Sequence, residues 1–363
     1  MNILKLNIKV RLAIAGVAAI VLIAALVFGI RAILPSHELS FKRIAQEIPT
    51  ASIKAIEPFG DGFLIFDGTA LRYYDDKGNY QWEYSLGVAG DIQFFAYDAQ
   101  VVLWCDTSFA LVKSDGSLNY SGQMAAPIES ARCGSSLAAL KLSGSDGVLI
   151  LDLTGATVDN IELHQNALMD YGFYATGDLM WMLTLDVSGA VPVSMLQTYQ
   201  PGKLLTGGYS FSDQIVYEAL FHQEQITMEG THYITTSSKT ANEAQASPIA
   251  IYGWELATWA MQKGVPAMLF TLTSQENTTP TALRVVQGTD ITNLYVPPGS
   301  LAVYAGSNAV YSIGTNAVYS LPYAGGKTTS YSLPSPIDGI AAKLSGNKVL
   351  VTSEAHVYML SLP

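Results

Sequence analysis

The stretch "GFLIFDGTALRYYDDKGNYQWEYSL", residues 62–86, contains the pattern that decides the fold. Two short apolar runs come first, an Asp-Lys-Gly turn follows, and Trp82 opens a last run. Short runs rich in β-branched and aromatic residues, separated by Gly, Asp and Asn, are typical of β-strands joined by tight turns. The stretch therefore predicts one antiparallel sheet unit, and the architecture depends on whether this unit recurs.

Glycine-marked turns between apolar runs do recur along the chain. The steps between them are 38, 39, 47, 62 and 62 residues. The first steps are close to the ~40–45 residues of a four-stranded propeller blade, and the two longer ones predict insertions. Two further apolar runs precede each turn, which gives four strands per unit. The turns are at Gly78, Gly116, Gly155, Gly202, Gly264 and Gly326.

These repeats predict an all-β fold, a β-propeller. Helical periodicity is nearly absent outside the N-terminal segment, and "WELATWAM" from Trp254 is expected to form a helical turn in an insertion. The repeated "NAVYSIGTNAVYS", residues 308–320, predicts two strands of one hairpin.

The last repeat predicts how the ring closes. Three apolar runs precede Pro363 where a blade needs four strands, so an N-terminal strand is expected to complete the blade and cover its edge. The stretch "ELSFKRIAQEI", Glu38–Ile48, is the candidate, although Leu39, Ile44 and Ile48 also fit one face of a short helix. Six glycine turns and this shared blade give seven blades, with six or eight as alternatives.

The first thirty residues contain an apolar segment. Residues 12–30 carry no charge, and a helix of this length crosses nearly all of a ~30 Å hydrocarbon layer. A signal peptide is the alternative, but its apolar region is typically about 7–15 residues long and ends at a small-x-small site. The expected organisation is a cytoplasmic tail (1–11), a transmembrane helix (12–30), a linker with the closing strand (31–49) and the propeller (50–363).

Charge bears on topology and on partners. Lys5, Lys9 and Arg11 precede the apolar segment, which favours a cytoplasmic N-terminus and an extracytoplasmic propeller in a single-pass cell-membrane protein. Residues 45–363 carry 29 acidic and 13 basic side chains, a net charge of −16. This charge argues against nucleic acid and against docking on an anionic membrane surface.

One repeat also carries a resemblance. The unit that contains Leu71, Asp76, Gly78 and Trp82 resembles the repeat of quinoprotein-type propellers, which are PQQ-like and WD40-like. With an N-terminal anchor, the chain resembles single-pass, membrane-anchored propeller proteins of clostridia-like Gram-positive bacteria.

The quinoprotein resemblance implies an enzyme only where adjacent bridged cysteines, a Trp and a calcium site hold the quinone. This chain has only Cys105 and Cys133, which are not adjacent and are expected to be buried free thiols, a bridge being the alternative. Trp82 is therefore expected to pack between blades, and no cofactor is expected.

Candidate metal sites are weak. "DDKGN", Asp75–Asn79, fits a tight turn better than a calcium loop. His222 and His232, with Glu224 and Glu229 between them, would form a metal cluster only if their hairpin folded back, and an ordinary polar hairpin is expected. The other histidines, His37, His164 and His356, match no catalytic spacing. No catalytic, cofactor-binding or metal-binding residue is predicted.

The function expected from these features is a non-enzymatic interaction or scaffold module of the cell envelope, with an envelope or membrane protein as partner. The predicted insertion from Thr236 to Gly264 places Tyr252, Trp254 and Trp259 in a short span, and such residues are common at interface hot spots. Filling of the groove between blades is the alternative role for these aromatics. A degenerate quinone-dependent or hydrolytic enzyme, and a sensor or carbohydrate-binding propeller, are the alternative functions.

Overall fold

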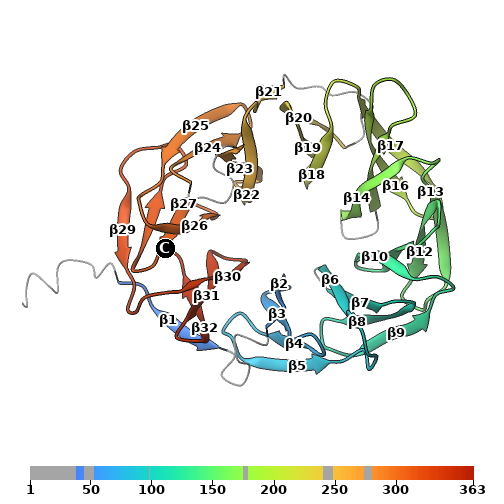
Figure 1. The fold of residues 1–363 in the computed structure, drawn as a ribbon, viewed down its shortest axis with the longest axis horizontal. Coiled ribbons are helices and arrows are strands. Elements are labelled where there is room, and N and C mark those ends of the chain that lie inside the picture. The colour runs from blue at the N-terminus through green and yellow to red at the C-terminus, as the bar shows by residue number, and fades with distance from the viewer. Residues whose placement is uncertain (1–37, 45–52, 98, 175–178, 240–247, 274–279) are drawn as a thin grey trace, which may run out of the picture.

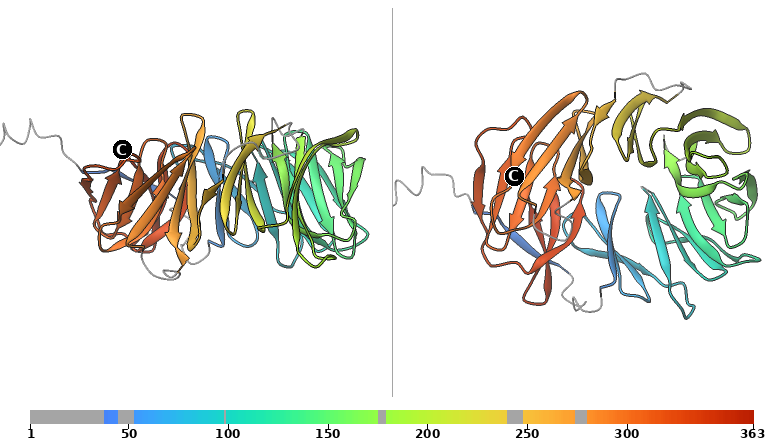
Figure 2. Two further views of the ribbon diagram at one scale, coloured as in Figure 1. Left: turned by 90° about the horizontal axis from the view of Figure 1, so that it is seen from above. Right: turned by 45° about the horizontal axis from the view of Figure 1, so that its top comes forward.

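The computed structural model describes residues 38–44, 53–97, 99–174, 179–239, 248–273 and 280–363. Its strands form eight antiparallel sheets of four strands each, arranged as a ring around a central opening (Figure 1). In the side view of Figure 2 the ring is a disc, and the strands run across its thickness. The chain is an all-β, eight-bladed β-propeller, so the prediction of seven blades is wrong and the alternative of eight is correct.

The first four blades follow one another in sequence, each with its first strand innermost. Blade 1 comprises β2 (Ala55–Phe59), β3 (Gly62–Phe66), β4 (Leu71–Tyr74) and β5 (Tyr80–Tyr84). Blade 2 comprises β6 (Gln93–Tyr97), β7 (Gln100–Cys105), β8 (Ser108–Lys113) and β9 (Leu118–Gln123). Blade 3 comprises β10 (Ile128–Cys133), β11 (Leu137–Leu142), β12 (Gly147–Asp152) and β13 (Thr157–Glu162). Blade 4 comprises β14 (Ala167–Tyr174), β15 (Leu179–Asp186), β16 (Val193–Gln200) and β17 (Leu204–Phe211).

The other four blades complete the ring. Blade 5 comprises β18 (Val216–His222), β19 (Gln225–Gly230), β20 (Tyr233–Ser238) and β21 (Ile249–Ala250). Blade 6 comprises β22 (Trp254–Gln262), β23 (Val265–Leu272), β24 (Ala282–Gln287) and β25 (Asp290–Tyr295). Blade 7 comprises β26 (Ser300–Ala305), β27 (Val310–Gly314), β28 (Ala317–Leu321) and β29 (Thr329–Ser332). Blade 8 comprises β30 (Gly339–Leu344), β31 (Lys348–Ser353), β32 (His356–Ser361) and the N-terminal β1 (Phe41–Ile44).

The ring closes through β1, as the closure prediction required. This strand pairs antiparallel with β32, where Phe41 lies opposite Leu360 and Ile44 opposite Val357. Ile44 is buried in the cluster shared by blades 8 and 1. Closure therefore covers the outer edge of β32, which would otherwise expose unpaired backbone groups.

The glycine pattern does not reveal blade 5, because the sequence between its third and fourth strands, β20 and β21, contains no glycine. Gly264 lies in the first hairpin of blade 6, between β22 and β23, and not in a third turn like the earlier glycines. The described residues of the predicted insertion therefore belong to the ring itself: β20 and β21 complete blade 5, and β22 begins blade 6. "WELATWAM" belongs to β22, so the predicted helical turn is wrong. The duplicated "NAVYS" segments do form neighbouring strands, β27 and β28, as predicted.

Position within the blade decides which side chains are buried. All residues of β3 and of β7 are buried, because second strands have a neighbouring blade on each face. The outermost β5 has an alternating, mostly exposed pattern and carries polar residues. The near-continuous apolar runs of the sequence are therefore the middle strands.

Neighbouring blades meet through a repeated contact. A side chain of the fourth strand of one blade lies against the glycine turn of the next, where a β-carbon would collide with it. Trp82 lies on Gly116 in this way, and its Nε1 donates a 2.8 Å hydrogen bond to the Ser114 carbonyl. Trp82 thus packs between blades, as expected. The equivalent pairs are Ile44 with Gly78, Tyr120 with Gly155 and Val158 with Gly202.

The innermost strands of blades 3 to 8 each contain a β-bulge. A bulge adds one unpaired residue and re-aims the side chains beside it. The extra residue is a large exposed side chain in β14, β18 and β26, where it is Met169, Tyr217 and Leu301, and it is also exposed in β10 and β22. Bulges therefore shape the wall of the central opening.

The membrane helix predicted at residues 12–30 lies outside the described residues. Within the part of the chain that the structure describes, no helix is long and apolar enough to cross a bilayer.

Candidate functional site

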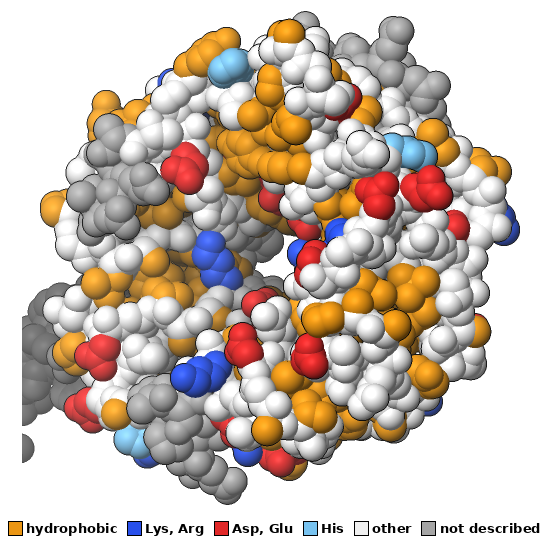
Figure 3. Space-filling view, turned by 45° about the vertical axis from the view of Figure 1, so that its right-hand side comes forward, with side chains coloured by type: hydrophobic (Ala, Val, Ile, Leu, Met, Phe, Trp, Pro, Cys, Tyr) orange, Lys and Arg blue, Asp and Glu red, His pale blue; other side chains and the backbone are white. Residues whose placement is uncertain are grey.

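The contact between blades 5 and 6, which we call the 5/6 seam, differs from the other contacts between blades. Innermost strands of neighbouring blades pack on one another, as β22 does on β26, whereas β18 packs mainly on β23 of blade 6. The space-filling view shows a hollow with hydrophobic side chains at its base where these two blades meet (Figure 3). The seam is therefore incompletely filled.

The three aromatic residues predicted to bind a partner all lie at this seam, but they do not form one cluster. Tyr252 lies in the turn between β21 and β22, is 66% exposed and stacks on His232 with a ring-centroid distance of 5.1 Å. Trp254 begins β22 and Trp259 lies five residues further along it. A bulge lies between them, and they pair with Leu272 and Met268, which are four residues apart on β23. At about 3.3 Å per residue, this spacing separates their backbones by about 13 Å.

Trp254 packs between blades, which was the alternative role considered for these aromatic residues. Its ring packs against the apolar cluster between blades 5 and 6. The guanidinium of Arg284 lies over it at 4.3 Å from the ring centroid. A stacked cation of this kind stabilises the contact within the blade. Trp254 is therefore part of the seam's packing.

Trp259 is 40% exposed, although its neighbour Thr258 is buried and Ala260 is partly buried. It pairs with Met268 of β23, and directly paired residues share a face of the sheet. Met268 faces blade 5, so Trp259 does as well. Met261, 37% exposed, lies two residues further on the same face. An exposed apolar pair thus borders the seam at the β22–β23 end.

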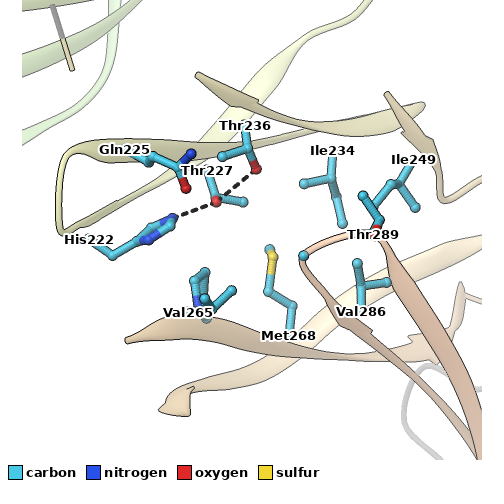
Figure 4. Close-up of a pocket in the computed structure, with 12 residues that line it drawn as sticks. His222, Gln225, Thr227, Ile234, Thr236, Ile249, Val265, Met268, Val286 and Thr289 are labelled. Carbon is cyan, nitrogen blue, oxygen red and sulfur yellow. Dashed lines mark hydrogen bonds between the residues drawn. The ribbon is translucent and has the colours of Figure 1, made fainter. Parts of the chain in front are cut away.

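A cavity of about 210 Å³ lies in the seam at the same end (Figure 4). Six residues of blade 5 line one wall and six of blade 6 line the other. The apolar part is formed by Ile234, Ile249, Val265, Pro266, Met268 and Val286. The polar part is formed by His222, Gln225, Thr227, Thr236 and Thr289, and Gly288 completes the lining.

A hydrogen-bonded chain crosses the blade 5 wall of this cavity (Figure 4). His222 Nε2 lies 2.8 Å from Thr227 Oγ1, which lies 3.1 Å from Thr236 Oγ1. Burial lowers the pKa of His222 and outweighs the opposing effect of the Gly264 backbone, so the ring is neutral at physiological pH. The cavity wall therefore offers hydrogen-bonding groups without a net charge.

A buried acid lies deeper in the seam. Glu229 of β19 is fully buried, and its Oε1 accepts a 2.8 Å hydrogen bond from the hydroxyl of Tyr217. Burial, with the charges of Glu218 and Glu255, raises the pKa of Glu229 to about 7 against the lowering effects of Tyr217 and of the Leu256 backbone. Its charge therefore changes near neutral pH.

The central opening carries charged side chains on several innermost strands (Figure 3). Arg132 of β10 donates to Asp170 of β14 at 3.1 Å, and its guanidinium lies 4.8 Å from the ring centroid of Phe95. The pKa values of Glu57 and Glu218 are raised, chiefly by burial. The wall is thus acidic, with Arg132 holding blades 3 and 4 together.

The structure also places the residues weighed as metal ligands. His222 ends β18 at one face of the disc, whereas His232 lies in the β19–β20 turn at the other, so the hairpin does not bring them together. No group of three or more potential ligands occurs in the described ranges. Asp75 accepts hydrogen bonds from the backbone of Lys77 and Asn79, as the turn interpretation of "DDKGN" predicted.

Both cysteines are buried and free. Cys105 lies in the second strand of blade 2 and Cys133 in the first strand of blade 3. Cys133 Sγ donates to the Gln100 carbonyl at 3.3 Å, and burial raises its pKa to about 12. Its thiol is therefore protonated at physiological pH.

The seam's other polar residues carried only faint signals in the sequence. Thr227 and Thr236 sit on neighbouring strands of blade 5, and their pairing across the sheet is visible only once the register is known. Glu229 lies in an otherwise apolar strand between Met228 and Gly230, which is the one local indication of a buried acid.

Comparisons with known proteins bear on the fold alone. No protein-family model matches the chain, and no curated protein matches it. The WD40 domain of SCAP from fission yeast superposes with a TM-score of 0.56 at 10% identity, covering 89% of this chain and 97% of that chain. BamB from Moraxella catarrhalis gives 0.55 at 11% identity, covering 90% and 97%. The computationally designed Ika8 protein gives 0.55 at 10% identity, covering 88% and 98%.

These similarities agree with the PQQ-like and WD40-like resemblance at the level of architecture. The chain is a β-propeller structurally similar to BamB and to WD40 domains.

Proposed function

We propose that the chain is a non-enzymatic interaction module of the cell envelope, anchored by residues 12–30 with its propeller on the extracytoplasmic side. Its partner is an envelope or membrane protein, and the contact surface is the β22–β23 end of the 5/6 seam. The observation that carries the proposal is the exposure of Trp259 beside Met261, on a strand whose other face is buried or partly buried at this end.

The chemistry of this surface suits a protein partner. A large exposed indole beside a flexible thioether supplies apolar area that a partner buries, and Trp is among the commonest hot-spot residues. The β22–β23 hairpin ends in a tight turn at Lys263 and Gly264, which both have positive φ, 52° and 79°. A rigid edge of this kind loses little conformational entropy when a partner binds.

Charge around the surface adds specificity. Glu218 and Glu255 lie on the innermost strands on either side of the seam, and the described wall of the opening is mostly acidic. A partner with basic residues around an apolar centre complements this arrangement. The proposed contact therefore combines an apolar anchor with an electrostatic rim.

Site-specific photocrosslinking tests the proposal. A photoreactive residue at position 259 of the full chain, in membranes of the source cell, is expected to give a discrete protein adduct. The same residue at the exposed position 187, between β15 and β16 of blade 4, is the control and is expected to give none. An adduct at 187 alone, or at neither position in a folded protein, contradicts this contact surface.

A further inference from the structure

The cavity in the 5/6 seam has features of a built ligand site. It lies between two blades, and neither Trp259 nor Met261 lines it, so its lining differs from the side chains proposed to contact a partner. Tight turns bound its mouth: Gln223 has a φ of 46°, and a β-carbon on Gly264 would collide with the Gln223 side chain. The two walls are therefore fixed against each other at this end of the seam.

Its volume sets the size of the occupant. About 210 Å³ exceeds the ~150 Å³ of an apolar protein cavity that takes up benzene. One ring with a short substituent, or a branched chain of similar bulk, fits this space. Larger ligands require the two blades to separate.

The lining sets the charge of the occupant. Its twelve residues include no Asp, Glu, Lys or Arg, and His222 is neutral. Burying an ion without a partner is costly, so a carboxylate or an amine is disfavoured here. The occupant is therefore an uncharged molecule.

The chain of hydroxyl groups on the cavity wall sets the position of the ligand's polar group. Thr227 Oγ1 is engaged on both sides, by His222 and by Thr236. A hydroxyl has one donor and two acceptor positions. Among the described residues, Thr236 Oγ1 has only its contact with Thr227, so it retains hydrogen-bonding capacity at the cavity wall.

From this arrangement we propose that the cavity binds a small, uncharged amphiphile of the aromatic or branched alcohol class. The apolar body contacts Met268 and Val286 of blade 6, and the hydroxyl hydrogen-bonds to Thr236 at the end of the chain from His222 (Figure 4). The ligand contacts involve neither Trp259 nor Met261, so loss of partner binding and loss of ligand binding can be measured separately.

Three matched probes test the chemistry on the full-length protein with a labelled Met268 methyl group. Benzyl alcohol is expected to shift the Met268 resonance in a saturable manner. Toluene, which lacks the hydroxyl, is expected to bind about tenfold more weakly, because one hydrogen bond is typically worth a factor of this order. Benzoate is expected to cause no shift.

Variants locate the interaction. Thr236→Val is expected to weaken benzyl alcohol binding about tenfold and to leave toluene binding unchanged. Thr235→Val is the matched control, because Thr235 precedes it on β20, faces the other side of the sheet and should leave both affinities unchanged. Val286→Phe is expected to fill the cavity and abolish both shifts while the rest of the spectrum stays folded.

The outcomes separate the proposal from its rivals. Equal binding of toluene and benzyl alcohol, with no effect of Thr236→Val, shows an apolar void that does not recognise the hydroxyl and overturns the proposal. Absence of any saturable shift up to the solubility of benzyl alcohol shows a closed or water-filled space and overturns it as well. If Val286→Phe does not fold, the comparison of Thr236→Val with Thr235→Val still tests whether the cavity recognises the hydroxyl.

Discussion

Trp82 of blade 1 lies across Gly116 of blade 2, and its indole Nε1 donates to the Ser114 carbonyl 2.8 Å away. Gly116 has a φ of +81°, which L side chains rarely adopt, and a β-carbon there would lie 2.7 Å from the indole. The glycine thus serves both the turn and the close approach of the neighbouring blade.

This relationship predicts unequal costs for two glycine substitutions. Gly144 also has positive φ, +72°, but a β-carbon there meets nothing within 4 Å. Gly144→Ala should cost about 1 kcal/mol from backbone strain alone, whereas Gly116→Ala should cost at least about 1 kcal/mol more because Trp82 must move. Denaturant unfolding measures both, and equal losses would contradict the packing role of Gly116.

The closing strand should carry a measurable share of the stability. Ile44 is buried between blades 8 and 1, so Ile44→Ala should lower the free energy of unfolding by about 2–4 kcal/mol. Lys42, exposed on the same strand, is the control, and Lys42→Ala should change it by less than about 0.5 kcal/mol. Similar melting temperatures for the two variants would show that β1 contributes little to the closed ring.

Glu229 should make stability depend on pH in one direction. Burial raises its pKa from 4.5 to about 7, so the folded protein binds this proton more tightly than the unfolded chain. Its contribution is therefore most favourable below pH 4.5 and declines as the pH rises through 7. Glu229→Gln should leave stability at pH 4 nearly unchanged and raise it by about 1–3 kcal/mol at pH 8.

Exposed Glu162 on β13 provides the control for this measurement. Glu162→Gln makes the same substitution at an exposed carboxylate and is measured under the same conditions. Chemical unfolding at pH 4, 6 and 8 gives the comparison, and a Glu229→Gln curve parallel to that of the parent protein would argue against a strongly raised pKa.

The buried thiol of Cys133 should resist modification in the native state. It is inaccessible, donates to the Gln100 carbonyl and has a pKa raised to about 12. A disulfide reagent at pH 8 should therefore react with it only after unfolding. Intact mass under non-reducing conditions checks the bridge, because a mass two daltons below that of the reduced chain would reveal a disulfide with Cys105.

The proposed topology predicts which side of the membrane holds the propeller. Lys5, Lys9 and Arg11 lie before the apolar segment, so the propeller should be digested by protease added to intact cells without an outer barrier. A cytoplasmic protein is the control for lysis. Digestion that occurs only after lysis would place the propeller in the cytoplasm.

Much of the architecture followed from local sequence patterns. Apolar runs of strand length, broken by turn residues, determined the all-β class, and the glycine turns at Gly78, Gly116 and Gly155 gave a repeat near the length of one blade. The three C-terminal runs showed that a strand was missing, and β1 supplies it. Such features are readable because turn chemistry and strand periodicity act over a few residues.

The tertiary structure alone decided the blade count and the nature of the seam. Blade 5 has no glycine in its outer turn, so only the pairing of β18 to β21 identifies it. The same pairing assigns the described residues of the predicted insertion to strands of blades 5 and 6. It also places Trp254 and Trp259 at different positions along β22. Likewise, the contact of Thr227 with Thr236 and the burial of Glu229 depend on register and on the approach of blade 6. These interactions join residues on different strands and blades, and the energy of such packing depends on distances in space that no local pattern encodes.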